Sequence, residues 1–320
     1  MTDISVFGAG AFGTALAISL ARAGRKVSLI ARTTAHAKAM DAAGENAARL
    51  PGFSFPDSVT PTDHATNPAP ICLIAVPTPV LRAYLDRHGN ALGGRMVVAC
   101  CKGIDIASGL GPTGMIASAC PTATAAILSG PGFAVDIAAG LPTALTLAAQ
   151  TDQDAQILQT ALSSANLRLY RSTDLVGVEL GGALKNVIAI AAGIAIGAGL
   201  GESARAALIT RGYAEMKRLA LDLGALPETL SGLSGLGDLV LTCSSEKSRN
   251  FSLGLALGRG ERTTKHVTVE GVTTAKAVSN IINYRKLDMP VTSAVSALLE
   301  QKITVQEAVE MLFSRPLKKE

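Results

Sequence analysis

Aromatic side chains are scarce in this sequence: they make up 3% of its 320 residues, and tryptophan is absent. Many proteins that bind single-stranded nucleic acids stack the bases on aromatic side chains, so this class of function is disfavoured. The net charge of +4 is also too small for the dense basic surface of a nucleic-acid binder, although it suits a small anionic ligand. We therefore expect no nucleic-acid partner.

Cysteine is present, but never in the spacing of a redox or structural pair. The five cysteines include no CxxC motif, and no spacing of cysteine and histidine matches a metal site. They are Cys72, Cys100, Cys101, Cys120 and Cys243. We expect reduced, partly buried thiols, no bound metal and a cytoplasmic protein. A signal peptide is not expected either, because the acidic Asp3 stands where such a peptide carries basic residues.

Charged residues are nearly missing from one long segment, 180–200, which reads LGGALKNVIAIAAGIAIGAGL. Glycines such as Gly193 and Gly197 interrupt its apolar run, so we expect a buried helix between other helices and no membrane span. The segment nevertheless contains Lys185, followed by Asn186. A lone ammonium in such surroundings must reach water, lose its proton or serve a function.

The chain is long enough for two domains, and 48% of its residues are hydrophobic. Near its start, the sequence DISVFGAGAFGTALAISLARAGRKVSLIAR indicates a strand, a turn, a helix and a second strand. Gly8, Gly10 and Gly13 give this turn the G-x-G-x-x-G pattern of dinucleotide-binding folds. The glycines permit a tight turn, close approach of the backbone to a pyrophosphate, and close packing of helix on strand. The amino terminus of the helix then attracts the phosphates.

The residue after the second strand helps to distinguish NAD from NADP. Enzymes that use NAD tend to place an acidic residue there, which holds the ribose 2′-hydroxyl. This sequence has Arg32, followed by Thr33 and Thr34, with Lys38 further on. A guanidinium can pair with a 2′-phosphate, so the pattern predicts a preference for NADP(H), with NAD(H) also possible. The alternative is a solvated arginine at the end of a strand.

Strand signals continue to about residue 172, after which helical periodicity takes over. The sequence therefore predicts an α/β domain over residues 1–175, with a doubly wound parallel sheet of the Rossmann type, followed by an all-α substrate-binding domain over residues 176–320. Lys102 follows a strand-like run. Because ligands of open parallel sheets bind at the carboxyl ends of strands, Lys102 is placed where an anion would bind. The alternative is a surface lysine in a loop.

One polar segment of the second half, GLSGLGDLVLTCSSEKSRNFSLG at residues 232–254, is interpreted as a loop. It contains Asp238, Thr242, Ser248, Arg249 and Asn250. Its arginine, asparagine and hydroxyl groups can surround a phosphate or a carboxylate. The alternative, which the segment alone does not exclude, is a helix start that Ser248 caps while Arg249 is exposed.

A dehydrogenase needs a proton donor beside its cofactor, which carries the hydride. Histidine is the usual donor, but the histidines lie outside the glycine turns and the polar segment; they are His36, His64, His88 and His266. Lys185 is the remaining candidate. Burial in an apolar helix lowers the pKa of a lysine toward neutrality, which suits an acid or base, and Asp238 would then hold the ammonium. The alternative is a lysine whose ammonium reaches water from a helix end.

Five segments of the chain closely resemble the bacterial NAD(P)-dependent glycerol-3-phosphate dehydrogenases: VFGAGAFGTALA, SGPGFA, ELGGALKNVIAIAAGI, ARAALITRG and GLGDLVLTCSSEKSRN. The resemblance covers nearly the full chain, and its last three segments are specific. It implies the reversible reduction of dihydroxyacetone phosphate to sn-glycerol 3-phosphate, which supplies glycerophospholipid synthesis. A homodimer that acts on a small phosphorylated substrate is expected.

The same resemblance implies roles for single residues. Lys185 would be the proton donor and acceptor, and Lys102 would contact both cofactor and substrate. The substrate would also meet Gly130, Asp238, Ser248, Arg249 and Asn250, with Thr242 close to the reacting end. Besides Lys102 and the three glycines, the cofactor would contact Ala11, Phe12, Arg32, Ala134, Arg249 and Glu270.

Three departures from the family pattern bear on affinity. Ala11 and Phe12 stand where serine and tryptophan are common, Gly132 stands in place of a serine, and Ser203 in place of an asparagine. None of them removes a charged group from the expected chemistry. Two other functions stay open: a related two-domain hydroxy-acid dehydrogenase, in which the polar segment holds a carboxylate, and a dinucleotide-binding sensor without catalysis.

Overall fold

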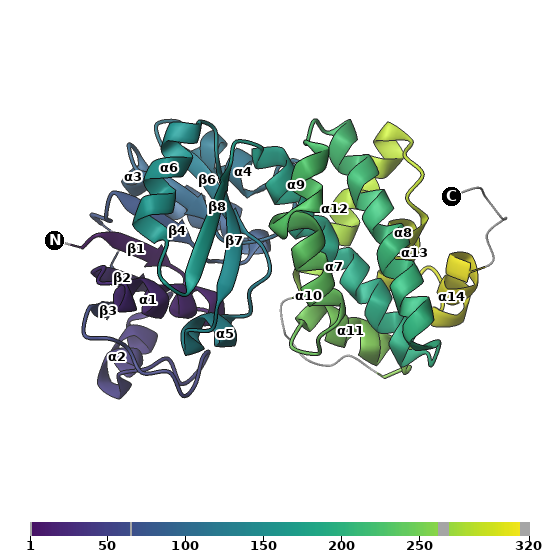
Figure 1. Cartoon of the computed structure of the whole chain (residues 1–320), viewed down its shortest axis with the longest axis horizontal. Coiled ribbons are helices and arrows are strands. Elements are labelled where there is room, and N and C mark those ends of the chain that lie inside the picture. Colours follow the sequence, from purple (N-terminus) through teal and green to yellow (C-terminus); the bar gives the residue numbers. More distant parts are fainter. Residues whose placement is uncertain (1, 65, 262–268, 314–320) are drawn as a thin grey trace. The chain divides into compact units, whose positions relative to one another are not determined.

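A computed structural model describes residues 2–64, 66–261 and 269–313 of the chain (Figure 1). Its contacts divide the chain into two units. The first contains the residues up to Lys102 and Leu110–Glu179, and the second contains Gly103–Gly109 and the chain from Leu180 onward. The sequence suggests a division after residue 175. The sequence does not predict that residues 103–109 belong to the second unit. Ile104 of this segment is buried in the core of that unit.

The first unit is built on one eight-stranded sheet of order β3-β2-β1-β4-β5-β6-β7-β8. Strand order runs outward in both directions from the β1 and β4 pair, which is the doubly wound arrangement that the sequence predicts. The strands are β1 (Ile4–Phe7), β2 (Val27–Ile30), β3 (Val59–Thr62), β4 (Ile71–Ile74), β5 (Met96–Ala99), β6 (Thr124–Ser129), β7 (Thr143–Ala149) and β8 (Leu167–Ser172).

The predicted parallel sheet is confirmed except at one pair, since β6 and β7 are antiparallel. Helix α5 (Ala134–Ala139) connects them and packs against α1 (Ala11–Arg22). A parallel connection must cross back over the sheet, usually through a longer helix. Since α5 stays at the carboxyl end of β6, the chain re-enters the sheet from that same edge.

Helices cover both faces of the sheet, which is typical of parallel strands with apolar side chains on both sides. Side chains of β1 alternate between the faces: Ile4 and Val6 belong to one core, and Phe7 belongs to the other. The first core also contains side chains of α1, α2 (Thr34–Ala43) and α6 (Asp152–Leu162). The second contains side chains of α3 (Thr78–Leu92) and α4 (Pro112–Ala119).

The regular secondary structure of the second unit is entirely helical among the described residues, as the sequence predicts (Figure 1). Its elements are α7 (Leu175–Gly197, which begins in the first unit), α8 (Gly201–Asp222), α9 (Pro227–Ser231), the π-helical turn η1 (Leu233–Gly237), α10 (Asp238–Cys243), α11 (Arg249–Gly258), α12 (Glu270–Arg285), α13 (Pro290–Leu299) and α14 (Val305–Phe313).

The interpretation of residues 232–254 as a loop is therefore wrong: most of the segment is helical, and only Ser244–Ser248 connect α10 to α11. Its glycines suggested turns, but at least one of them serves packing. A Cβ atom at Gly235 would overlap the carbonyl of Leu230. Gly181 of α7 in turn lies against the backbone of Ser234, where a Cβ atom would be 2.7 Å from its carbonyl oxygen.

Helix α7 is the buried core helix that segment 180–200 predicts. It is long and apolar enough to cross a membrane by length and composition, but 89% of its most apolar window is buried within the protein. Gly193 and Gly197 explain its glycine content, because Cβ atoms there would overlap the backbone of α11 at Phe251 and Leu255. Small residues thus let the backbones of α7 and α11 approach closely.

The carboxyl group of Glu179 in α7 holds the first turn of α4. Its Oε1 accepts the backbone N–H of Thr113 at 2.6 Å, and a Cβ atom at Gly111 would collide with the carboxylate. Burial raises the pKa of Glu179 to about 7, although the hydrogen bonds from Thr113 act in the opposite direction. The fold therefore favours the protonated form of this side chain.

This pKa predicts how Glu179→Gln changes stability. An acid whose pKa rises on folding from 4.5 to about 7 contributes stability that is complete below about pH 4.5 and is lost as pH rises through 7. Glutamine keeps an acceptor for Thr113 and never ionises. At about 1.4 kcal/mol per pKa unit, the rise from 4.5 to about 7 should make the variant more stable than the wild type by about 3 kcal/mol in free energy of unfolding at pH 8. The gain should shrink to about 1 kcal/mol or less at pH 5.

Urea unfolding of both proteins at pH 5 and pH 8 measures this effect. Glu228→Gln, at an exposed position in α9, is the matched control and should follow the wild type at both values. An equal difference in free energy of unfolding between Glu179→Gln and the wild type at pH 5 and pH 8 would contradict the prediction.

Candidate functional site

The glycines of the turn between β1 and α1 meet three different demands. Gly8 has φ +107, and a Cβ atom there would lie 2.8 Å from the carbonyl oxygen of Ala75. A Cβ atom at Gly13 would overlap the carbonyl oxygen of Gly8, so this glycine allows the helix to pack on the turn. At Gly10 a Cβ atom would meet nothing within 4 Å, which leaves open space beside the backbone.

This turn fits a dinucleotide. Gly10 is the N-cap of α1, and no side chain caps the helix there. Backbone N–H groups and the positive end of the helix dipole are therefore available to a pyrophosphate. The partly buried side chains of Ala11, Phe12 and Ala134 pack against one small core formed by α1 and α5, so the structure brings these predicted cofactor residues together.

Arg32 is exposed between β2 and α2, at the carboxyl edge of the sheet. The turn that follows is well ordered by hydrogen bonds: Thr33 accepts the backbone N–H of His36 as the N-cap of α2, and Thr34 donates to the carboxylate of Asp63. The Thr34 hydroxyl lowers the pKa of Asp63 from its usual value. Sequence reasoning missed Asp63, which follows β3 and reaches this turn only because β3 lies beside β2.

Lys102 and Gly130 lie together at the carboxyl ends of β5 and β6. The Lys102 ammonium donates to the carbonyl oxygen of Gly130 at 2.9 Å. Gly130 has φ +143, a conformation that favours glycine. At Gly132 a Cβ atom would lie 3.2 Å from Thr143 Cγ2 and 3.3 Å from Ile137 Cδ1, so a serine there would be crowded by these neighbours. The departure at Gly132 therefore has a packing reason in this chain.

Lys185, Asp238 and Thr242 form a buried cluster in the second unit. The Lys185 ammonium lies 3.0 Å from Asp238 Oδ1 and 2.7 Å from Thr242 Oγ1, and the Thr242 hydroxyl donates to the same carboxylate oxygen at 3.2 Å. The side chains of Lys185 and Asp238 are 9% and 2% exposed. Asp238 and Thr242 are four residues apart on α10, so they share the face that meets α7.

This cluster shows how a lysine can be buried in an apolar helix. The ammonium does not reach water from a helix end; it is held inside the unit by a carboxylate and a hydroxyl. A carboxylate at this distance favours the charged form and opposes the effect of burial. A lysine held in this way is chemically able to act as a proton donor.

A second polar network lies beside the first. Asn250 Oδ1 accepts the backbone N–H of Gly271 at 3.0 Å, and Asn250 Nδ2 donates to Asn186 Oδ1 at 2.8 Å. Asn186 is 2% exposed, and its Nδ2 has no hydrogen-bond partner among the described residues. Sequence reasoning treated Asn186 only as the neighbour of Lys185. Its pairing with Asn250 joins residues 64 positions apart, which no local pattern reveals.

The start of α11 is compatible with both interpretations of Ser248–Asn250, a capped helix start and an anion site. Ser248 is the N-cap and its hydroxyl accepts the backbone N–H of Phe251 at 3.2 Å, while Arg249 is exposed. An exposed arginine at a helix amino terminus remains suited to an anion. Glu270 is the first residue of α12, one position before Gly271, and is half-buried. Ser203 is exposed in α8 and contributes to neither network described above.

The other nucleophilic and basic side chains do not join these clusters. None of the five cysteines forms a disulfide within the described structure, and all five are buried, more fully than the sequence suggests. Cys243 follows Thr242, but burial raises the pKa of its thiol to about 12, so it is not a nucleophile at neutral pH. Three histidines, His36, His64 and His88, lie in or near α2, β3 and α3, while His266 lies outside the described residues.

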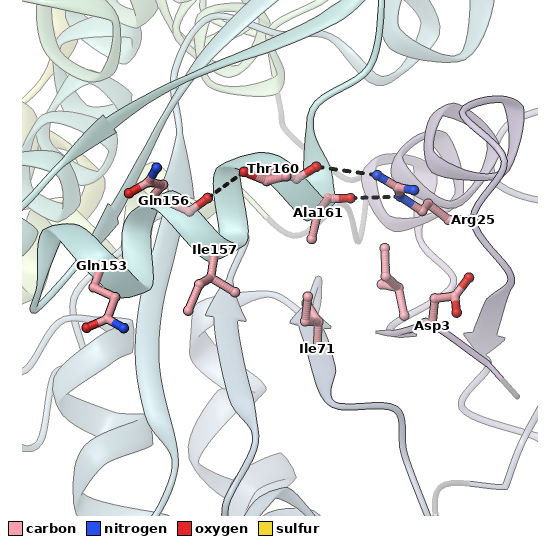
Figure 2. A pocket seen from close by; sticks show the side chains of 9 residues that line it. Asp3, Arg25, Ile71, Gln153, Gln156, Ile157, Thr160 and Ala161 are labelled. Carbon is pink, nitrogen blue, oxygen red and sulfur yellow. Dashed lines mark hydrogen bonds between the residues drawn. The ribbon is translucent and has the colours of Figure 1, made fainter.

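A cavity of about 650 Å³ in the first unit does not contain the predicted residues (Figure 2). Asp3 and Ile71 place it at the amino ends of β1 and β4, at the edge opposite the glycine turn. Arg25 lines it and donates to the carbonyl oxygens of Ala161 at 3.1 Å and Thr160 at 3.3 Å, at the end of α6. These bonds close a helix terminus, so we assign this cavity a structural role.

Comparison with known proteins gives consistent results along the whole chain. A family model described as NAD-dependent glycerol-3-phosphate dehydrogenase N-terminus matches residues 3–155, and the corresponding C-terminus model matches residues 174–310. A protein of a Ruegeria species named glycerol-3-phosphate dehydrogenase [NAD(P)+] is 55% identical over 320 residues, which cover 99% of this chain and 100% of that protein. A protein of Cereibacter sphaeroides with the same name is 56% identical over 318 residues, with coverage of 99% and 100%.

The fold is similar to that of a solved structure as well. The crystal structure of glycerol-3-phosphate dehydrogenase from Coxiella burnetii matches with a TM-score of 0.93 and 37% identity, over 98% of this chain and 99% of that one. The match therefore extends over both units of this chain.

Proposed function

Because the chain belongs to the NAD-dependent glycerol-3-phosphate dehydrogenase family, we propose that it catalyses the reversible reduction of dihydroxyacetone phosphate to sn-glycerol 3-phosphate, with NADPH preferred and NADH also accepted. The observation that carries the proposal is the buried ammonium of Lys185, held by Asp238 and Thr242. A buried charge is costly, and a proton donor for a carbonyl accounts for it.

Residues of the first unit bind the cofactor, and residues of the second unit supply the proton. The glycine turn holds the pyrophosphate, and Arg32 pairs with a 2′-phosphate. When bound, the reduced nicotinamide supplies the hydride. Lys185 gives a proton to the oxygen that becomes the alcohol, and Asp238 and Thr242 keep its ammonium in place. Lys102 adds positive charge beside Gly130.

The substrate phosphate would be held at the start of α11. Arg249 and the N–H groups of this helix terminus are suited to it, and Asn250 is fixed in place by Gly271 and Asn186. Glu270 would contact the cofactor from the start of α12. We further propose, from the family resemblance of the sequence, that the product enters glycerophospholipid synthesis in the cytoplasm and that the working form is a homodimer.

The test is the loss of reduced-cofactor absorbance with dihydroxyacetone phosphate. Turnover of this substrate, and much weaker turnover of phosphate-free hydroxy or keto acids, supports the proposal. A preference for a keto acid would favour the hydroxy-acid dehydrogenases instead. Binding of the cofactor without any turnover would favour a sensor.

The preference between cofactors is a separate prediction that concerns Arg32. The wild type should have a higher kcat/KM with NADPH than with NADH. Arg32→Ala should lower kcat/KM for NADPH about 10-fold or more, because a charge-assisted hydrogen bond is lost, and change that for NADH little. Equal effects on both cofactors, or a wild type that favours NADH, would remove this role from Arg32 and leave the reaction intact.

A further inference from the structure

Asn46 makes a set of hydrogen bonds behind the glycine turn. Its side chain is completely buried, at 0% exposure. Nδ2 donates to the carbonyl oxygen of Ala9 at 3.1 Å and to Thr14 Oγ1 at 2.8 Å. Ala9 lies between Gly8 and Gly10 in the turn, and Thr14 lies in the first turns of α1. A residue far along the chain therefore holds the turn from inside the protein.

The orientation of this amide follows from its partners. The carbonyl oxygen of Ala9 can only accept, so the group that faces it must be the amide nitrogen. Both hydrogens of Nδ2 are then used, and Oδ1 is left to accept from His36 Nε2 at 3.1 Å. Since Oδ1 carries no hydrogen, the ring of His36 must carry a proton on Nε2. His36 thereby fixes the Asn46 amide in one orientation.

The consequence for the turn lies in the peptide between Ala9 and Gly10. The structure has no cis peptide among its described residues, and in a trans peptide the C=O and the following N–H point in opposite directions. With the Ala9 carbonyl held toward Asn46, the Gly10 N–H is turned away from it. Gly10 is also the position beside which a Cβ atom would meet nothing within 4 Å.

We propose that Asn46 is a positioning residue for the cofactor pyrophosphate: it holds the Ala9 carbonyl inward so that the Gly10 N–H faces the phosphate, with His36 as its lock. The proposal rests on the proposed function only in that the glycine turn is the cofactor site. Asn46 does not touch the cofactor, and its effect is preorganisation of a donor.

Removal of this contact should weaken both dinucleotides alike. Asn46→Ala should raise the Kd of NADPH and of NADH about 10-fold each, because the pyrophosphate is common to both, and leave their ratio unchanged. His36→Ala keeps both hydrogen bonds that Asn46 donates and removes only the contact of His36 with Asn46 Oδ1. The Kd of each cofactor should therefore rise only about 3-fold. Titration of cofactor fluorescence in the absence of substrate measures these constants without reference to turnover.

Ser5→Ala is the matched control for general loss of stability. Ser5 lies on β1 in the same unit, three residues before Gly8, and is 2% exposed. Its hydroxyl accepts the backbone N–H of Ala69 at 2.9 Å, and its side chain makes no hydrogen bond to the turn among the described residues. This variant should lower Tm and leave both Kd values unchanged. A specific rise in Kd for Asn46→Ala beyond that of Ser5→Ala supports the proposal.

Two outcomes with a folded Asn46→Ala variant overturn the proposal. In the first, the Tm of Asn46→Ala falls as that of Ser5→Ala does, but the Kd values of both cofactors equal those of the wild type. The proposed function would then stand without the role of Asn46. In the second, the Kd values of NADPH and NADH rise by different factors, which would assign Asn46 to the 2′-phosphate site. If Asn46→Ala does not fold, the His36→Ala variant is the test, because His36 is half-exposed. An unchanged Kd in His36→Ala then overturns the proposal. A wild type that binds neither cofactor overturns this proposal and the proposed function together.

Discussion

Lys185→Ala is expected to reduce turnover at least about 100-fold, which is the contribution typical of a positioned general acid or base. The variant loses the group that gives a proton to the developing alkoxide, while the glycine turn and Arg249 remain. The KM for dihydroxyacetone phosphate and the Kd of the cofactor should change much less than kcat. Steady-state kinetics and a cofactor titration of the same preparation measure both effects.

Stability needs its own control in this experiment, because Asp238 would be left buried without its cation. Breaking one partner of a buried ion pair typically costs about 3–5 kcal/mol. The double variant Lys185→Met/Asp238→Asn removes both charges and should fold better than Lys185→Ala while remaining equally inactive. Lys185→Arg keeps a cation, but a guanidinium cannot release a proton near neutral pH, so it should also be inactive. Near-normal turnover in any of these variants would end the assignment.

Sequence reasoning performs best where function depends on neighbours in the chain. The glycine turn is predicted residue by residue, because the positive φ of Gly8 and the close packing of Gly13 are local demands. Lys185 is singled out because an ammonium in an apolar helix needs an explanation. Its partner Asp238 is also predicted, since it lies in the segment 232–254, which the sequence marks as rich in polar groups.

It fails where distant segments meet. The networks of Asn46 with Ala9, and of Asn186 with Asn250, join residues 37 and 64 positions apart, and the amide groups carry no spacing pattern that reveals them. The antiparallel β7 is missed because strand direction depends on where α5 packs. The helices η1 and α10 are missed because glycines that serve packing look like glycines that form turns.

Arg249→Ala is expected to raise the KM for dihydroxyacetone phosphate about 10- to 100-fold, because a hydrogen bond to a charged group contributes about 1.5–3 kcal/mol. The fall in kcat should be smaller, since the Lys185 cluster is untouched. Arg249 is exposed, so its removal should leave Tm nearly unchanged. The variant should also discriminate less between dihydroxyacetone phosphate and dihydroxyacetone, because the lost contact is to the phosphate alone.

Arg259→Ala is the matched control, because it removes the same charge just beyond the other end of α11, where the side chain is 54% exposed beside Glu261. Its KM should equal that of the wild type, which separates a specific phosphate contact from a change in the overall positive charge. An unchanged KM in Arg249→Ala would mean that Ser248 only caps a helix and that the phosphate is held elsewhere. A loss of kcat without a change in KM would place Arg249 with the reacting carbonyl instead of the phosphate, since only an interaction made in the transition state has that signature.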